Sequence, residues 1–215
     1  MNDLGLPPAI VSDTPIKPHL FIHIPKTAGI SIKFVPGIRD SRHYQADWYR
    51  QRFPFKFQKA FKFSIVRNPF DRVVSAWEFV RAKGLGLGTK FPQIYTLYDE
   101  VQSFGNSLED FDEFCRTALV KMHYNWMEFR TQHWFLCSSN NILVDYVGRY
   151  ETLQESWSYI AAQIGCRDTL DHRNINPYRQ PYQKYYGKQS TIDAVLSVYH
   201  KDFSLFQYDT NLPLK

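Results

Sequence analysis

The sequence predicts an α/β fold in which helices flank a central, mainly parallel sheet. Two apolar runs typical of buried strands, residues 19–22 and 60–66, each lead directly into a segment that can start a helix. A third such run, at residues 142–147, is followed by another helical pattern. Strands that alternate with helices favour parallel pairing through right-handed crossovers, so we expect a domain of this class.

The size and charge of the chain fit one globular domain that binds an anion. Its 215 residues are 44% apolar, which is sufficient for a substantial core. We expect an irregular, proline-punctuated arm over residues 1–18 and a single domain over residues 19–215. The formal net charge of +5 favours anionic ligands without requiring nucleic acid, and no nucleic-acid partner is expected.

The cysteine spacing and the lack of a long apolar run argue against a disulfide-stabilised, zinc-binding or membrane-spanning protein. Cys115, Cys137 and Cys166 form no C-x-x-C pair, so neither a disulfide framework nor a zinc site is indicated, and a reducing compartment is expected. No run approaches the ~20 apolar residues that a membrane-spanning helix needs, so we expect no stable membrane insertion. Residues 1–18 also lack the layout of a signal peptide. The sequence does not specify an oligomeric state.

The first functional motif is the turn after the strand at residues 19–22. It reads His-Ile-Pro-Lys-Thr-Ala-Gly-Ile-Ser over residues 23–31 and leads into a short helix expected at residues 30–35. Backbone N–H groups and the positive end of the helix dipole meet at such a turn and attract an anion, and Lys26 adds a mobile ammonium. The alternative is an ordinary strand-to-helix turn with a solvated lysine.

Other side chains of this turn suit the same purpose. Gly29 has no Cβ to block the approach of a bound group, and Thr27 and Ser31 carry hydroxyl donors. His23, at the end of the strand, is expected to support the loop. The expected phosphate or sulfate site comprises Pro25, Lys26, Thr27, Ala28, Gly29, Ile30 and Ser31.

This motif differs from the nucleoside-triphosphate loop G-x-x-x-x-G-K-[ST], because it has one glycine and its lysine precedes that glycine. A Mg·ATP site is therefore not expected. The motif instead resembles the 5′-phosphosulfate-binding loop of sulfotransferases, in the form H-I-P-K-T-[AG]-G-[TI]-S that occurs among bacterial and carbohydrate-modifying members.

A second motif begins where the strand at residues 60–66 ends. Asn68 can cap a helix, and Pro69 suits the first helical position because its missing N–H costs nothing there. The residues expected to form the buried face of this helix are Phe70, Val73, Val74 and Trp77. Arg67 at the strand end and Ser75 off this face can both point into the ligand crevice of an open α/β sheet.

Residues 66–77 resemble the 3′-phosphate-binding element of sulfotransferases, V-R-[ND]-P-[FYW]-[DE]-R-[LV]-x-S-x-[WYF]. The resemblance implies that Arg67 and Ser75 hold the 3′-phosphate of 3′-phosphoadenosine 5′-phosphosulfate (PAPS), a co-substrate that leaves as adenosine 3′,5′-bisphosphate. It also implies a three-layer, P-loop-like fold and a reaction that needs no metal.

The rest of the chain continues the alternation of helices and strands. Helices are expected after a cap at Ser107 and at residues 124–136, 154–164 and 190–206, with a flexible glycine-rich loop at residues 83–89. Residues 148–153 look like the family's G-R-[FY]-E-x-L stretch. Residues 167–188 interleave basic residues with tyrosines, which suits either a loop packed on the core or a surface for adenine or an anionic glycan.

Sulfuryl transfer requires charge stabilisation and a base. The resemblance implies that Lys26 contacts the bridging and sulfuryl oxygens of the donor. A base with a pKa near 7 is also needed. His43 is the first candidate, because related glycan 2-O-sulfotransferases carry a histidine base between the two motifs, and His133 is the second. Arg130, His133 and Tyr186 are expected to contact the acceptor.

The expected function is the transfer of a sulfuryl group from PAPS to a hydroxyl, with a carbohydrate as the expected acceptor and a lipid, a phenol or a small metabolite as alternatives. A non-catalytic nucleotide-binding protein that keeps the fold and a P-loop kinase are the alternative functions. Animal Golgi members of the family carry a membrane anchor. Since none is found in this sequence, a bacterial cytoplasmic enzyme, or a protein trimmed of its anchor, is expected.

Overall fold

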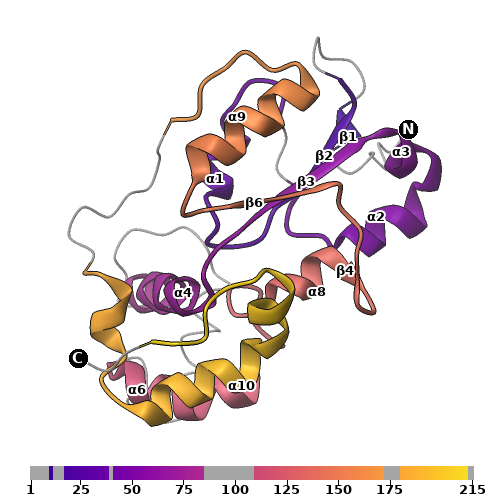
Figure 1. Cartoon of the computed structure of the whole chain (residues 1–215). Helices are drawn as coiled ribbons and strands as arrows, with labels where there is room; N and C mark the ends of the chain where they lie inside the picture. Colours follow the sequence, from indigo (N-terminus) through magenta and orange to yellow (C-terminus); the bar gives the residue numbers. More distant parts are fainter. Residues whose placement is uncertain (1–9, 12–16, 39–40, 85–108, 172–179, 213–215) are drawn as a thin grey trace. The chain divides into compact units, whose positions relative to one another are not determined.

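Parallel strand pairs form the centre of the main sheet, as the sequence predicts. The strand order is β1 (Ile10–Val11), β2 (His19–Ile22), β3 (Phe61–Val66) and β6 (Tyr146–Arg149). β2 pairs in parallel with β3, and β3 with β6, whereas the short β1 is antiparallel to β2 (Figure 1). The carboxyl ends of β2 and β3 therefore lie at the same edge of the sheet, and both predicted motifs begin there.

The chain divides into two compact units. The computed structural model describes residues 10–11, 17–38, 41–84, 109–171 and 180–212. The first unit comprises Met1–Arg67 and Gln132–Pro177 and contains the sheet, and the second comprises Asn68–Thr131 and Tyr178–Lys215. Most of the predicted glycine-rich loop, and residues 172–179 of the basic and tyrosine-rich segment, lie outside the described residues.

The strand predicted at residues 142–147 is displaced along the chain. β4 (Cys137–Ser138) and β5 (Asn141–Ile142) instead form a hairpin across a two-residue turn, in which Ser139 has a φ of 55°. The parallel strand β6 starts only at Tyr146, because the Asp145 carboxylate accepts the Lys62 backbone N–H at 2.8 Å and pairs with the Lys62 ammonium at 2.8 Å. The Asp145 backbone N–H also donates to the Lys62 carbonyl at 2.8 Å, so the pairing with β3 begins one residue before β6.

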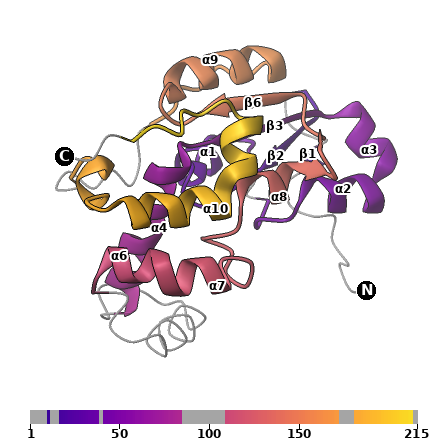
Figure 2. The same ribbon diagram turned by 60° about the horizontal axis from the view of Figure 1, so that its bottom comes forward.

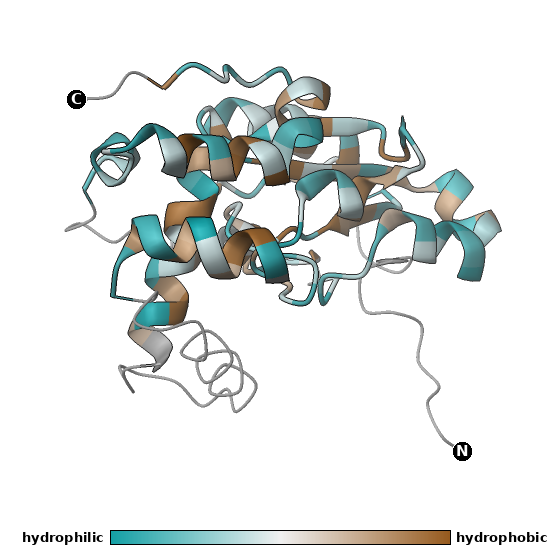
Figure 3. Ribbon diagram, turned by 90° about the horizontal axis from the view of Figure 1, so that it is seen from below, coloured by the Kyte–Doolittle hydropathy of each residue, from teal (hydrophilic) through white to brown (hydrophobic). Residues whose placement is uncertain are grey.

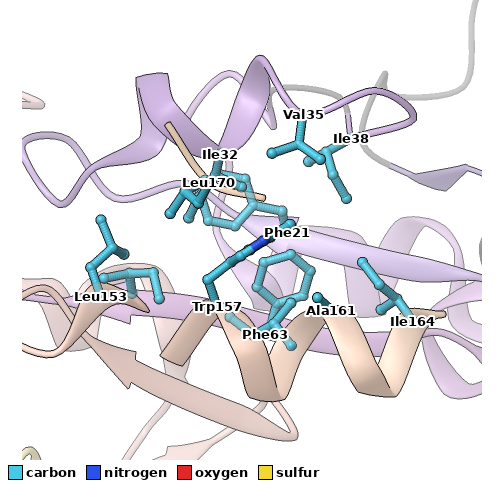
Figure 4. Close-up of a cluster of buried hydrophobic side chains, with 12 residues drawn as sticks. Phe21, Ile32, Val35, Ile38, Phe63, Leu153, Trp157, Ala161, Ile164 and Leu170 are labelled. Atoms are coloured by element: carbon cyan, nitrogen blue, oxygen red, sulfur yellow. The ribbon is translucent and has the colours of Figure 1, made fainter. Parts of the chain in front are cut away.

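The core of the first unit lies between the sheet and α9 (Leu153–Ile164). Figure 4 shows Phe21 and Phe63 from the strands facing Trp157 and Ala161 of α9. The helix ends, as predicted, at Gly165, whose φ of 75° is a left-handed conformation that glycine adopts readily. Burial of these large side chains, at about 25 cal/mol per Å² of apolar surface, holds α9 on the sheet.

Shorter helices complete the first unit. They are α1 (Gly29–Lys33), α2 (Ala46–Arg52), α3 (Pro54–Lys59) and α8 (Gln132–Leu136). In Figures 1 and 2, α9 lies on one side of the sheet, and α2 and α8 lie together on the other. The three-layer arrangement expected from the sequence is thus present in this unit.

The second unit is helical, and its first helix follows the prediction closely. α4 (Pro69–Gly84) begins after Asn68, whose side-chain oxygen accepts the Phe70 backbone N–H at 2.9 Å. The predicted apolar face is buried, with exposed fractions of 5% or less for Phe70, Val73, Val74 and Trp77. In Figure 3, hydrophobic and hydrophilic residues alternate along the helices, the pattern expected of helices with one buried face.

The other helices of this unit pack together. They are α6 (Phe111–Phe114), its π-helical continuation η1 (Cys115–Leu119), α7 (Val120–Met122), η2 (Tyr182–Tyr185) and α10 (Gln189–Leu205). α6 and α7 lie beside α10 (Figure 2). The predicted cap at Ser107 lies outside the described residues. The described helix begins at Phe111, where the Asp110 carboxylate accepts the N–H groups of Asp112 and Glu113.

The helix predicted at residues 124–136 forms only in its last turn, as α8. The preceding residues turn instead, because side chains take the carbonyls that a helix would use. The Arg72 guanidinium donates to the carbonyls of Arg130 at 2.8 Å and Glu128 at 3.1 Å. The Tyr199 hydroxyl donates to the Phe129 carbonyl at 2.5 Å. No local sequence pattern predicts such long-range hydrogen bonds.

A buried carboxylate links α6 to the start of α10. Asp112 is 9% exposed and accepts hydrogen bonds from the Thr191 hydroxyl, from Lys188 at 2.9 Å and from Arg116 at 3.1 Å. Burial alone would raise the pKa of Asp112, but these hydrogen bonds outweigh it and hold the pKa well below its ordinary range. The ionised form therefore stabilises the folded state.

We expect the unfolding free energy to fall as the pH drops below about 4, the ordinary aspartate pKa. In that range Asp112 is protonated in the unfolded state but still ionised in the folded state. Asp112→Asn should cost about 1–2 kcal/mol at pH 7, a figure kept low because Lys188 and Arg116 are largely exposed. It should also flatten this acid dependence. Denaturant titrations at pH 7 and pH 3 measure both effects, with Asp193→Asn on the exposed face of α10 as the matched control.

Candidate active site

The predicted anion-binding turn runs from the end of β2 into α1. Lys26 and Ala28 adopt left-handed conformations, with φ of 69° and 68°, and α1 starts at Gly29. Turn conformations of this kind gather successive backbone N–H groups into a concave, anion-binding surface. α1 has only five residues and no acidic residue in its first turn. Because α1 is so short, we expect the loop N–H groups and nearby cations to contribute more to anion binding than the helix dipole that the sequence suggested.

Two side chains of the turn hold its shape. The Thr27 hydroxyl is buried and donates to the Ile24 carbonyl at 2.9 Å. A hydroxyl has one proton, so the predicted donation from this group to an anion would break that bond, while the Thr27 backbone N–H is not affected. Ser31 is also buried, at 3% exposed.

Gly29 is required for a reason other than the predicted approach of a ligand. A Cβ at this position would lie 1.7 Å from Nε2 of His23, far inside any permitted contact. The backbone of α1 thus sits directly against the His23 imidazole, which is 5% exposed. The glycine lets the helix start pack on this ring.

The turn meets Arg67 from the second motif. The Arg67 guanidinium, at the carboxyl end of β3, donates from Nη1 to the Lys26 carbonyl at 3.1 Å and stacks over the Tyr150 ring at 4.0 Å. Arg67 is 4% exposed, so a buried positive charge lies against the loop that carries Lys26. Two segments separated by 41 positions thereby converge, as the motif analysis expected.

Gln132 and Tyr150 fix Arg67, and the sequence analysis gave neither of them a role. The Gln132 amide brackets the backbone of Arg67, accepting from its N–H at 2.9 Å and donating to its carbonyl at 2.8 Å. The Tyr150 N–H donates to the Val66 carbonyl at 2.8 Å, which keeps its ring beside the strand end. Tyr150 falls inside the family-like stretch at residues 148–153, and that position was its only signal in the sequence.

His43 is anchored beside the same loop. Its Nδ1 lies 2.8 Å from the His23 carbonyl oxygen, and the two imidazole rings are 4.2 Å apart between centroids. A carbonyl oxygen only accepts, so Nδ1 carries the proton, and in the neutral ring the lone pair is on Nε2. This tautomer can accept a proton through Nε2. His43 has a φ of 64° and follows Arg42 at 52°, two left-handed residues in succession.

The remaining predicted residues are divided between the units. His133 lies on α8 in the first unit, whereas Ser75 on α4, Arg130 and Tyr186 belong to the second. Arg130 is not on the same helix as His133, contrary to expectation, because α8 begins at Gln132; burial lowers the pKa of Arg130.

Tyr186 is 1% exposed. Its hydroxyl donates to the Phe70 carbonyl at 2.8 Å, and burial raises the pKa of its phenol well above the ordinary value. This position favours a structural role over the predicted contact with an acceptor.

The described residues contain neither a metal-binding cluster nor a membrane-spanning helix. No group of three or more histidine, cysteine, aspartate or glutamate side chains among them is arranged to hold a metal ion. Within the same part of the chain, none of the helices has the length and apolar character needed to cross a bilayer.

A parallel sheet with a tight turn after one strand and a buried arginine at the end of the next is typical of α/β proteins that bind phosphorylated ligands. A model of the Sulfotransferase family matches residues 14–209. The chain belongs to this family.

Among the curated proteins similar to this chain are carbohydrate sulfotransferases of animals. Carbohydrate sulfotransferase 10 of Danio rerio is 30% identical over 171 residues, which cover 69% of this chain and 47% of the relative. Carbohydrate sulfotransferase 14 of Danio rerio is 26% identical over 200 residues, covering 84% and 53%, and carbohydrate sulfotransferase 11 of Rattus norvegicus is 28% identical over 174 residues, covering 72% and 48%. The chain thus spans about half the length of the curated relatives it matches. No solved structure matches it significantly.

These comparisons correct the expected origin and location. The sequence predicts a bacterial cytoplasmic enzyme, but the matching relatives come from fish, frog, bird and mammals. That expectation was wrong because it rested on a nine-residue motif shared with bacterial members and on the missing anchor. Neither feature identifies the group of organisms.

Proposed function

We propose that this protein transfers the sulfuryl group of PAPS to a hydroxyl of a carbohydrate. The observation that carries the proposal is the bond between the Arg67 guanidinium and the Lys26 carbonyl, which brings a loop suited to a 5′-phosphosulfate and a cation suited to a 3′-phosphate into contact. Membership of the Sulfotransferase family and the names of the relatives support the same reaction and acceptor class.

The residues of the first unit fit a doubly anionic nucleotide. N–H groups of residues 27–31 would surround its 5′-phosphate, and Arg67 would serve the 3′-phosphate, with Ser75 as a further proposed donor. Because α1 has no acidic residue in its first turn, no fixed negative charge there opposes a bound phosphate. When bound, PAPS supplies an activated sulfuryl group on a good leaving group.

Lys26 and His43 have separate roles in the proposed reaction, charge stabilisation and proton transfer. The Lys26 ammonium stabilises the negative charge that develops on the bridging oxygen as the sulfur–oxygen bond of the donor breaks. Nε2 of His43 accepts the proton of the acceptor hydroxyl while the oxygen of that hydroxyl bonds to sulfur. His133 remains the alternative base, and Arg130 the alternative acceptor contact.

An aromatic and basic surface next to His43 suits a sugar acceptor. Tyr44 and Trp48 are 45% and 36% exposed, and their rings stack 4.5 Å apart at 22°. Flat aromatic faces pack against the apolar face of a sugar ring, and the exposed Arg42 and Arg52 flank this pair in the sequence. An acidic carbohydrate fits this combination better than a neutral one.

Calorimetry tests the donor site. Adenosine 3′,5′-bisphosphate should bind at least about tenfold more tightly than ATP, a difference of about 1.4 kcal/mol, because only the former offers a 3′-phosphate to Arg67. Equal affinities, or tighter binding of ATP with Mg²⁺, would favour a P-loop kinase.

A panel of acceptors with labelled PAPS then tests the transfer, with uronic-acid-containing and neutral oligosaccharides compared side by side. Nucleotide binding without transfer to any member would favour the non-catalytic alternative.

A further inference from the structure

The imidazole ring of His23 lies against the core, the start of α1 and the ring of His43. The His23 ring stacks on Phe21, with centroids 5.4 Å apart and planes 17° apart, and lies 4.2 Å from the ring of His43. On a further side it meets the start of α1, where Gly29 leaves room for it. His23 is thus a packed spacer between the core, the donor loop and the candidate base.

The backbone of His23 also holds the segment that carries His43. Its N–H donates to the Ser41 hydroxyl at 2.9 Å, and its carbonyl accepts from Nδ1 of His43 at 2.8 Å. Ser41 is fully buried, and its carbonyl accepts from the Tyr49 hydroxyl at 3.3 Å. These bonds fix a segment whose two left-handed residues, Arg42 and His43, would be costly without support.

We propose that His23 is a positioning residue for the reaction: its ring presses His43 into the orientation in which Nδ1 is protonated and Nε2 faces the acceptor, and Gly29 exists to admit that ring. The inference rests on the proposed role of His43 as the base. It adds that the His23 side chain, three residues before Lys26, links the position of the donor loop to the orientation of the base.

The physical reason is the limited choice that an imidazole has. A histidine that can rotate about its side-chain bonds exchanges tautomers and hydrogen-bond partners. The His23 ring, whose centroid lies 4.2 Å from that of the His43 ring, removes that freedom. The bond from Nδ1 of His43 to the carbonyl therefore persists, and the lone pair stays on Nε2. Misplacement of a reacting group by about 1 Å can lower a rate about 100-fold.

The first test reads the tautomer directly and needs no activity. In nitrogen-15 imidazole spectra recorded at a pH where the histidines are neutral, wild-type His43 should show the Nδ1-protonated form. His23→Ala should shift it towards the Nε2-protonated form, whereas His200→Ala, an exposed histidine of α10, should not. An unchanged His43 spectrum in His23→Ala would overturn the proposal.

The second test separates positioning from donor binding. His23→Ala should lower kcat about 10- to 100-fold, less than the loss of His43 itself, with the affinity for adenosine 3′,5′-bisphosphate and the KM for acceptor within about twofold of wild type. Loss of nucleotide affinity at unchanged kcat would instead make His23 a part of the donor site and refute the positioning role.

Gly29→Ala supplies an independent variant in case His23→Ala folds poorly. The new Cβ collides with the ring and must displace it, so His43 should show the same tautomer shift. In the double variant the colliding ring is absent, so the effects on kcat should not add and the double variant should match His23→Ala. Additive losses would show that Gly29 acts on the donor directly and would contradict the inference.

The two levels of proposal fail differently. If wild type binds no adenosine 3′,5′-bisphosphate and sulfates no acceptor, the proposed function fails, yet the tautomer measurement still decides whether His23 orients His43. If transfer is observed and His43→Ala is fully active, His43 is not the base and the positioning role fails with it.

Discussion

Replacing Lys26 with alanine should abolish sulfuryl transfer, with a loss in kcat of about 10³-fold or more. In the proposed mechanism the ammonium acts where charge develops, on the bridging oxygen of the leaving group, and a single preorganised donor at such a position is worth about 10²- to 10³-fold. A full positive charge in place of a neutral donor moves the expectation to the upper end of that range or beyond it. Single-turnover assays with labelled PAPS measure the chemical step.

Nucleotide affinity should respond much less to this change. Adenosine 3′,5′-bisphosphate lacks the sulfuryl group, and Arg67 and the loop N–H groups are unchanged in Lys26→Ala, so calorimetry should still detect binding. Lys26→Arg keeps the charge but moves it on a longer, planar group, and should recover only part of the activity. Lys33→Ala, in the last turn of α1, is the matched control and should stay close to wild type. Full transfer activity in Lys26→Ala would disprove the mechanism.

Replacing His43 with alanine should lower turnover by about 10²- to 10⁴-fold while leaving nucleotide binding intact. The reason is geometric: Nδ1 of His43 is bonded to the backbone carbonyl of His23, which lies before the turn at residues 25–31, so removal of the proposed base is expected to leave the fold of the donor loop in place. Wild-type kcat should also fall as the pH is lowered and Nε2 becomes protonated, and this limb should be absent from the residual activity of the variant.

His133→Ala provides the comparison that decides between the two candidate bases. It also lies in the first unit, on α8, and should retain near wild-type turnover if His43 is the base. A large loss in His133→Ala together with an active His43→Ala would transfer the role to His133. Parallel pH profiles of both variants make the assignment unambiguous.

The fold was predictable wherever local chemistry decides it. Asn68 and Pro69 set the start of α4, Gly165 sets the end of α9, and the apolar run at residues 61–66 has the composition of a buried strand, so these elements lie where the sequence predicts. Predictions failed where distant side chains compete for the backbone. Arg72 and Tyr199 take carbonyls of residues 128–130 and prevent the expected helix.

In the candidate site, too, some features follow from local sequence and others from contacts between distant residues. Motif spacing pointed to Lys26 and Arg67 as partners, and the structure brings Arg67 to the Lys26 carbonyl. Nothing in the sequence indicated that Gln132 would hold the backbone of Arg67 from 65 positions away. The sequence also did not indicate that Gly29 makes room for the His23 ring, because a residue type alone does not show which neighbour occupies the space of a missing Cβ.

The sequence by itself determined the family, the parallel strands and the positions of the two segments proposed to bind anions, because each is encoded by residues adjacent in the chain. Only the tertiary structure decided which nitrogen of His43 carries the proton, why the turn needs a glycine, and which groups hold Arg67. Those features depend on contacts between residues far apart in sequence, and the free energy of such contacts has no counterpart in any local pattern.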